Sequence, residues 1–199
     1  NELEAKKKNV AKEMTKLWRY EKFGTPFERG GRYFFNHNSG TQNQYVMYTC
    51  DSLDDLQKKK KRVLLDVNSL RDDGTAALKN YSVSDDGKYL AHAISYGGSD
   101  WSTVFLRDVN TTKDIENVKL EWVKFSSISW TRDNQSFYYS RYPALDETLD
   151  QGTETTGSSN QMIFKYDINL NVSKLVYETP KHPKWMHSAE VSDDGRWLL

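Results

Sequence analysis

The side chains considered first for catalysis are four histidines, the aspartate pairs at 85–86 and 193–194, and one serine in a glycine-containing segment. A serine nucleophile on a strand-to-helix turn has the pattern Gly-x-Ser-x-Gly, which the sequence lacks. Ser99, in Gly-Ser-Asp at residues 98–100, has no second glycine and lies between two predicted strands. We therefore interpret Ser99 as a turn residue.

The histidines have none of the spacings that are typical of a metal site. They are His37, His92, His182 and His187, and neither His-Glu-x-x-His nor a Cys/His ligand spacing occurs. His92 falls within a predicted strand, which favours a structural histidine over a catalytic base. No glycine-rich phosphate-binding loop opens a helix. The sequence predicts no metal and no cofactor, and these residues by themselves form no catalytic constellation.

The paired aspartates belong to a repeated turn. At residues 85–87 and 193–195, Asp-Asp-Gly separates two apolar runs, which indicates a hairpin because glycine adopts positive φ without steric cost. A degenerate copy at 129–139 has Asn134 in the glycine position, and a weaker copy lies at 28–35. We expect the aspartates to make Asx-type hydrogen bonds across these turns rather than acid–base catalysis.

Strands of period two fill the intervals between the turns. They are predicted at 32–35, 44–48, 62–65, 88–94, 102–106, 118–122, 137–139, 161–166 and 174–177. The turn centres recur every 47 to 61 residues, and four-stranded repeats of about this length are typical of β-propeller blades. From the repeat alone, a β-sandwich is the alternative, although the strands of a sandwich do not usually recur as the same strand–turn–strand sequence. The predicted fold class is all-β, with propeller blades over residues 19–199.

A helix precedes the blades. In residues 1–18, Leu3, Val10, Met14 and Leu17 fall on one face, and lysine and glutamate fill the rest. The chain begins at a residue other than Met and ends at Leu199 inside an apolar strand, so we expect it to be a fragment of a longer protein.

Composition restricts the partners and the compartment. The formal net charge is zero, which gives no electrostatic reason to expect nucleic acid or a membrane surface as a partner. No apolar run approaches the roughly 18 residues of a membrane span. The single cysteine, Cys50, excludes an internal disulfide framework and fits a reducing compartment, so we expect a cytoplasmic protein.

Two places could bind a ligand. Phe125 directly precedes the inner strand of the third repeat, near one mouth of the predicted propeller, where it either packs in the core or forms the wall of a pocket. The long polar segment 143–160 is the other candidate, because loops of this length are commonly functional or disordered.

An ordered set of motifs resembles the prolyl oligopeptidase family over essentially the whole chain. It comprises residues 38–44, 70–78, Gly-Ser-Asp-Trp at 98–101, Val-Lys-Phe-Ser at 123–126, Gly-Thr-Glu-Thr at 152–155, Pro-Lys-Trp-Met at 183–186, and 189–196. The resemblance implies a seven-bladed propeller that caps an α/β-hydrolase catalytic domain. Residues 1–18 would pack with that catalytic domain, and the rest would form the first three blades and the start of a fourth.

The resemblance also implies an activity and several roles. Family members hydrolyse short peptides after proline with a Ser-Asp-His triad, which would lie beyond Leu199, so the chain alone is expected to be inactive. Phe125 matches an aromatic residue that lines a substrate subsite next to the one for proline, and residues 143–160 match a loop at the domain interface involved in access. Lys79 stands where arginine is common, and lysine lacks the bidentate fork of arginine.

Two other functions remain open from the sequence. One is a non-enzymatic propeller that binds partners through loops such as 143–160. The other is a related oligopeptidase with basic specificity.

Overall fold

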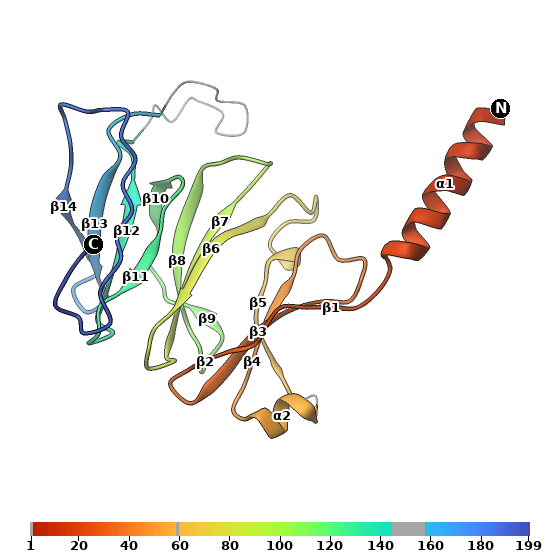
Figure 1. Cartoon of the computed structure of the whole chain (residues 1–199), viewed down its shortest axis with the longest axis horizontal. Helices are drawn as coiled ribbons and strands as arrows, with labels where there is room; N and C mark the ends of the chain where they lie inside the picture. Colours follow the sequence, from red (N-terminus) through yellow and green to blue (C-terminus); the bar gives the residue numbers. More distant parts are fainter. Residues whose placement is uncertain (1, 59, 145–157) are drawn as a thin grey trace. The chain divides into compact units, whose positions relative to one another are not determined.

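The computed structural model describes residues 2–58, 60–144 and 158–199, which form one long helix and three antiparallel sheets (Figure 1). The described part of the chain divides into two compact units. One unit contains the residues up to Glu28 together with Tyr33–Gly74, and the other contains Arg29–Arg32 together with Thr75–Leu199.

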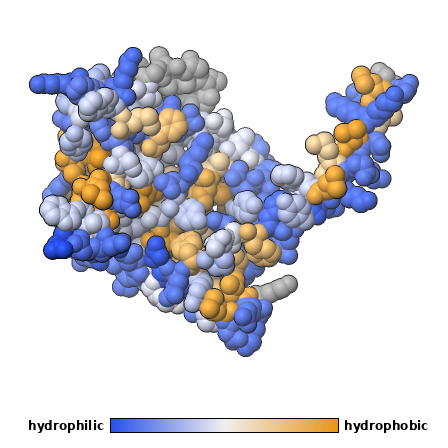
Figure 2. All heavy atoms as spheres, viewed as in Figure 1, coloured by the Kyte–Doolittle hydropathy of each residue, from blue (hydrophilic) through white to orange (hydrophobic). Residues whose placement is uncertain are grey.

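The first element is the predicted N-terminal helix, α1 (Glu2–Trp18). Glu2 and Glu4 occupy its first turn and Lys16 its last, an arrangement that complements the helix dipole. None of its residues is buried, and Figure 2 shows apolar side chains lying exposed along it. Val10, Met14 and Leu17 are 58%, 65% and 78% exposed, so the apolar face of α1 has no cover in the described part of the chain.

The first sheet follows α1. Its strands are β1 (Lys22–Phe23), β2 (Phe27–Arg29), β3 (Arg32–Asn38), β4 (Val46–Cys50) and β5 (Arg62–Asp66), in the order β1-β3-β4-β5 with β2 also on β3. Pro26 separates β1 from β2, because proline has no N–H for the ladder. Thus the innermost strand of this blade is split in two.

Two short helical elements in the first unit were not predicted. Helix α2 (Leu53–Gln57) begins at Ser52, whose hydroxyl accepts the Asp55 amide at 3.0 Å. The 3-10 turn η1 (Val67–Ser69) begins at Asp66, whose carboxylate accepts the Asn68 amide at 2.9 Å. Both arise from local capping rather than from an apolar period.

The second sheet, with five strands, and the third sheet, with four, both lie within the second unit. The second has the order β10-β8-β7-β6 with β9 on β8, and the third has the order β11-β12-β13-β14. The strands are β6 (Ala77–Val83), β7 (Tyr89–Ser95), β8 (Ser102–Asp108), β9 (Lys113–Asp114), β10 (Leu120–Val123), β11 (Ile128–Trp130), β12 (Ser136–Arg141), β13 (Met162–Asp167) and β14 (Val172–Tyr177). The predicted strands are therefore present, and the three sheets correspond to the three predicted blades.

The apolar core of this unit lies between the second and third sheets. The second sheet supplies small aliphatic side chains such as Ala91, Ala93 and Val104, and the third supplies the rings of Phe137 and Tyr139. Both rings are fully buried, and the Tyr139 hydroxyl donates to the Ser173 hydroxyl at 2.9 Å. Small side chains opposite rings let the two sheets pack closely.

The repeated turns have the predicted form. Gly87, Asn134 and Gly195 have φ of 69°, 57° and 71°, and the amide of each donates to the carbonyl three residues earlier. Asn134 thus replaces glycine in the left-handed region, which asparagine tolerates better than most residues. The fourth turn is closed by an isolated bridge between Val191 and Leu198.

The two aspartates of each pair have different roles, which the sequence did not distinguish. Asp86 makes the expected Asx contact, because its carboxylate accepts the Lys88 amide at 3.1 Å and the Ser84 hydroxyl at 2.7 Å. Although partial burial opposes it, hydrogen bonds from Ser84 and Lys88 hold the pKa of Asp86 below its usual value. Asp85 instead points away from its own turn and pairs with arginines.

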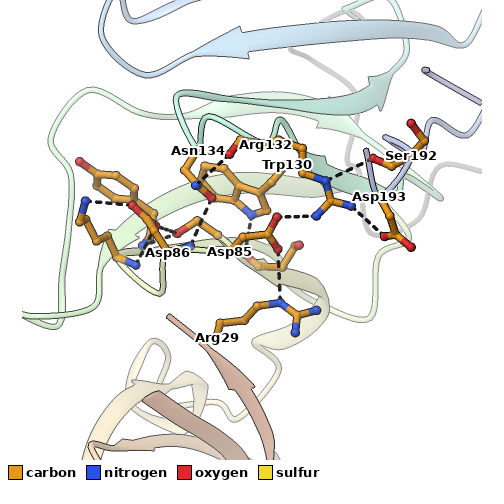
Figure 3. Close-up of polar contacts among 12 residues, drawn as sticks. Arg29, Asp85, Asp86, Trp130, Arg132, Asn134, Ser192 and Asp193 are labelled. Atoms are coloured by element: carbon orange, nitrogen blue, oxygen red, sulfur yellow. Dashed lines mark hydrogen bonds and ion pairs between the residues drawn. The ribbon is translucent and has the colours of Figure 1, made fainter. Parts of the chain in front are cut away.

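These arginine pairs join successive turns (Figure 3). Arg29 Nε lies 3.6 Å from Asp85, while Arg132 contacts Asp85 at 2.6 Å and Asp193 at 2.8 Å. Trp130 reinforces the boundary between the second and third blades by donating its indole N–H to the Ser82 carbonyl at 3.1 Å. Within the second unit, successive turns are thereby tied together.

Candidate functional site

The described residues contain no complete nucleophile–base–acid arrangement. Ser99 lies in the β7–β8 connection, where its hydroxyl accepts the Trp101 amide at 3.0 Å. His187 Nε2 lies 2.8 Å from the Thr179 hydroxyl, but in the part of the chain that the structure describes no carboxylate orients this imidazole. The structure therefore offers no triad among residues 2–58, 60–144 and 158–199.

His92 is a structural residue within the second sheet. It is 1% exposed, and its Nε2 lies 3.6 Å from Asp114, which Arg107 binds at 2.7 Å. Burial lowers the pKa of His92 from 6.5 to about 4, and Arg107 adds to the effect although Asp114 opposes it. The imidazole is thus neutral at physiological pH.

No cluster of three or more His, Cys, Asp or Glu side chains with metal-holding geometry occurs in the described ranges. Likewise, none of the helices described is both long and apolar enough to cross a bilayer.

Phe125 lies in the connection between β10 and β11, and its backbone is unusual. Trp122 and Phe125 have φ of 63° and 53°, in the left-handed region that aromatic side chains seldom occupy. The register of β10 against β8 shifts between Leu120 and Val123, so a bulge redirects the chain just before Phe125. A non-glycine residue in this region costs about 1–3 kcal/mol, and such residues cluster at functional sites.

A cavity of about 160 Å³ opens beside Phe125, at the end of the second blade opposite its Asp-Asp-Gly turn. Its floor is aliphatic and its rim is polar. The lining residues are Lys79, Asn80, Ala93, Asp100, Ser102, Val104, Val123, Phe125, Ser126 and Ile128. The volume is below the roughly 300–1,000 Å³ that encloses a drug-sized ligand, so the cavity suits one side chain rather than a whole peptide.

The Phe125 ring is 58% exposed, so it forms part of the cavity wall rather than of the buried core. Lys124 Nζ lies 5.4 Å from the centre of this ring and 5.1 Å from that of Trp101. The same ammonium group lies 3.9 Å from Asp100. The contacts of the Lys124 ammonium group with these two rings and this carboxylate help to fix the conformation of the loop.

Lys79 also approaches Asp100, but only at 4.0 Å, and both side chains are substantially exposed. An ion pair of this length and exposure contributes little to stability. Whether this pair differs from one that arginine would form at residue 79 stays a prediction of the resemblance.

The segment 143–160 was the other predicted site, and residues 145–157 lie outside the described residues. Both described ends of the segment lie beside the Phe125 loop. Tyr142 donates its amide to the Trp122 carbonyl at 2.9 Å, and Gln161 donates to the Lys124 carbonyl at 3.0 Å. The structure therefore places the two residues that flank this segment, Tyr142 and Gln161, in contact with the Phe125 loop.

Sequence reasoning missed several residues of this site. Asn80 lines the cavity and Gln161 contacts the Phe125 loop, yet neither stands out from the strand pattern around it. Asp100 lies within the Gly-Ser-Asp-Trp motif, which did offer a signal. Asn80 and Gln161 are revealed only by their hydrogen bonds to the Phe125 loop in the structure.

Comparison with protein families gives a match over the whole length. The model described as the N-terminal β-propeller domain of prolyl oligopeptidase matches residues 1–199. Prolyl oligopeptidase A of Amanita bisporigera is 36% identical over 90% of this chain, and the prolyl endopeptidase of Elizabethkingia miricola is 33% identical over 96%. The chain spans 26% of the length of each of these relatives.

Solved structures agree with this match. Prolyl oligopeptidase B from Galerina marginata, bound to a 35mer hydrolysis and macrocyclization substrate, superposes with a TM-score of 0.84 at 29% identity. The superposition covers 96% of this chain and 28% of that one. The all-β propeller fold with one preceding helix is thereby confirmed.

Proposed function

The chain belongs to the prolyl oligopeptidase family, and on that premise we propose that it is the N-terminal propeller portion of a serine endopeptidase that hydrolyses short peptides after proline. The observation that carries the proposal within the chain is the position of Phe125. Its exposed ring borders a cavity at one end of the second blade, beside both described ends of segment 143–160. This end is where the propeller would meet substrate.

The proposed chemistry belongs to the complete protein. A triad histidine removes the proton of the serine as the serine attacks the carbonyl carbon of proline, and backbone N–H groups stabilise the oxyanion. The propeller contributes by limiting access to short peptides and by binding the residue next to proline against Phe125.

The apolar face of α1 supports an intramolecular partner. Val10, Met14 and Leu17 are all more than half exposed, and amphipathic helices of globular proteins bury such a face. Met14 and Trp18 also line a cavity of about 330 Å³ with Gly40 and Thr41. We assign this face, in residues 1–18, to the contact with the α/β-hydrolase catalytic domain, and residues 19–199 to the propeller.

Two further parts of the proposal are the cytoplasmic location and the preference for an enzyme over a non-enzymatic propeller. Cys50 is a free, buried thiol whose pKa is raised by burial, consistent with a reducing, cytoplasmic location. The relatives compared above are named as peptidases, which favours the enzyme over a non-enzymatic propeller that binds partners.

Turnover of peptides by the full-length protein tests this function. Two fluorogenic peptides that differ only in proline or alanine before the scissile bond should be cleaved very unequally, with the proline peptide preferred. A serine-directed reagent should abolish the cleavage. Absence of hydrolysis would contradict the proposal and favour the binding module, whereas equal cleavage of both peptides would contradict the specificity for proline.

Phe125→Ala tests the role of the aromatic wall in the same protein. We expect KM to rise for a peptide that extends past proline into the Phe125 subsite, and to stay unchanged for a peptide truncated at that point. Leu170→Ala is the matched control, because Leu170 is 63% exposed in the β13–β14 turn at the opposite end of the third blade. Equal effects of Phe125→Ala on both peptides would argue against a subsite.

A further inference from the structure

The backbone carbonyls of the two residues on either side of Phe125 are held by side-chain amides from outside its loop. Gln161 Nε2 donates to the Lys124 carbonyl at 3.0 Å, and Asn80 Nδ2 donates to the Ser126 carbonyl at 2.8 Å. Phe125 lies between these two carbonyls at φ 53°. The strained residue is therefore fixed from both sides.

The two amides come from different blades. Asn80 belongs to β6 of the second blade, where the pairing register with β7 shifts between Leu78 and Asn80. Gln161 directly precedes β13 of the third blade. A loop that connects these two blades is thus anchored to each of them, which fixes the direction of the Phe125 ring relative to the cavity.

Each amide is itself held in one orientation. The Asn80 carbonyl oxygen accepts the Tyr81 amide at 2.7 Å, so its NH₂ group must face Ser126. Gln161 is 1% exposed, and its carbonyl oxygen accepts the backbone amide of His187. A buried amide that is satisfied at both ends is costly to rotate, so the donor to Lys124 is pre-organised.

A third contact holds the loop just after Phe125. The Ser126 hydroxyl accepts the Ser140 amide at 2.7 Å, from β12 of the third blade. The Ser140 hydroxyl in turn donates to the His187 carbonyl at 2.7 Å. The carbonyls of Lys124 and Ser126 and the hydroxyl of Ser126 are consequently all held, although the ring of Phe125 between them is exposed.

We propose that Asn80 and Gln161 are positioning residues that hold the strained backbone of Phe125, so that its ring forms a rigid wall for the substrate residue next to proline. This inference rests on the proposed function for the identity of the ligand. Because residues in sparsely populated backbone regions persist only where their surroundings determine them, loss of either donor should release the loop. A released ring would still be present but would bind the substrate residue less well.

Isosteric acids test the proposal in the full-length protein. Asn80→Asp and Gln161→Glu keep the accepting oxygen and the shape of each side chain, but the ionised acids have no hydrogen to donate. We expect KM for the extended peptide to rise about two- to tenfold, the range that the net value of one hydrogen bond gives. For the truncated peptide, KM and kcat should stay as in the parent protein.

The matched control is Asn169→Asp, which removes a donor of the same kind at the other end of the third blade. Asn169 Nδ2 donates to Gln135 at 3.1 Å on the surface. This variant should leave both peptides unaffected.

Protonation of the introduced glutamate in Gln161→Glu distinguishes loss of the hydrogen bond to Lys124 from a general disturbance of the fold. In Gln161→Glu the introduced carboxyl is buried, and once protonated at low pH it can again donate to Lys124. The ratio of KM values for the extended and truncated peptides should then return towards that of the parent protein as pH falls. A ratio that stays raised at all pH values, or never rises, would overturn the role of Gln161.

A double-mutant cycle covers the case in which the acids disturb folding. If Asn80 acts through Phe125, then Asn80→Asp should add nothing to the KM ratio in a Phe125→Ala background. An equal effect in both backgrounds would contradict the proposal. Asn80→Ala, which removes the donor without adding charge, serves as the second variant should Asn80→Asp fail to fold.

Fluorine NMR decides the positioning without any turnover. With 4-fluorophenylalanine incorporated in place of Phe125, Asn80→Asp and Gln161→Glu should shift and sharpen the resonance as the ring is released, whereas Asn169→Asp should not. An unchanged resonance in the first two variants would overturn the inference. A changed resonance in a protein that cleaves no peptide would support the positioning and contradict only the proposed function.

Discussion

Arg132, in the turn of the third blade, donates to Asp85, in the turn of the second blade, at 2.6 Å. The same guanidinium reaches Asp193 at 2.8 Å and the Ser192 carbonyl at 3.2 Å. One side chain therefore contacts both neighbouring turns, and Asp85 raises the pKa of Arg132 further above its already high value. The turns that the sequence identifies as local hairpins are also the points where blades are joined.

Arg132→Gln should lower Tm of the full-length protein by a few degrees at most, because the pairs are partly exposed. The decrease should be larger at low salt than at high salt, since salt screens exposed charges. Arg196→Gln is the control, because Arg196 pairs with Asp194 inside its own turn at 2.6 Å. Thermal melts at two NaCl concentrations measure Tm of both variants. An equal decrease in Tm for the two would show that an ion pair between turns stabilises the protein no more than a pair within one turn.

Gly30→Ala should destabilise the protein by about 2–5 kcal/mol, because two penalties add. Gly30 has φ 56°, and an added Cβ would lie 2.1 Å from the Asp86 carbonyl oxygen. Gly31 is the matched control, since its φ is 78° but an added Cβ meets nothing within 4 Å. Gly31→Ala should therefore cost only about 1–2 kcal/mol, the backbone penalty alone. Urea unfolding of both variants measures the difference. Equal decreases in the free energy of unfolding would refute the close approach of residue 30 to the Asp86 carbonyl.

His92 should make the protein less stable as pH falls from about 6.5 to about 4. The pKa of His92 is lowered to about 4 in the folded state, so between these values the unfolded chain binds more protons. The effect reaches up to about 3 kcal/mol at the acid end of this window. Denaturant unfolding at pH 7 and pH 4.5 measures it, and His92→Gln should remove this part of the pH dependence.

The carboxylates of Asp133 and Asp194 affect stability at a lower pH than His92 does, so they serve as an internal control for the pH dependence. Hydrogen bonds lower the pKa of Asp133 and Asp194 below 3.8, so their contribution is present above that value and is lost as pH falls further. His92→Gln should leave the loss below about pH 3.8 unchanged. A parent protein whose stability is flat between pH 6.5 and 4 would contradict the assignment to His92.

Trp130→Phe should cost about 1–2 kcal/mol, because the Ser82 carbonyl loses its indole donor while the ring packing is largely kept. The phenyl ring retains contact with Phe137, whose centre lies 5.1 Å from that of Trp130. Trp185→Phe is the control at an exposed tryptophan and should change the free energy of unfolding by less than about 0.5 kcal/mol. Comparable losses in urea unfolding would show that the indole N–H is unimportant.

The sequence predicted the blades well because strand period and turn residues are local signals. The Asp-Asp-Gly phrase located the hairpins at Gly87 and Gly195, and the fold followed from their repetition. It did not reveal that Asp85 and Asp86 differ, because that difference depends on Arg132 from another blade. Helix α2 was missed since its five residues are set by the Ser52 cap and carry no period.

The candidate site was predicted only in part. Phe125 was identified by its place before an inner strand and by the family resemblance, and its role as a subsite remains a prediction. Asn80 and Gln161 could not be found from sequence, because their function lies in the direction of an amide group towards carbonyls 37 to 46 residues away. Such contacts depend on how adjacent blades pack.

The residues at the matching position of the four turns are Arg29, Asp85, Arg132 and Asp193, so their charges alternate in sign along the chain. Alternation of two signs can close a ring only when the number of members is even. A closed ring of seven blades, which the family resemblance implies, therefore has at least one boundary where two adjacent turns lack this pairing of opposite charges. That parity would make one junction between the blades of such a ring electrostatically different from those described here, however similar the blades are in fold.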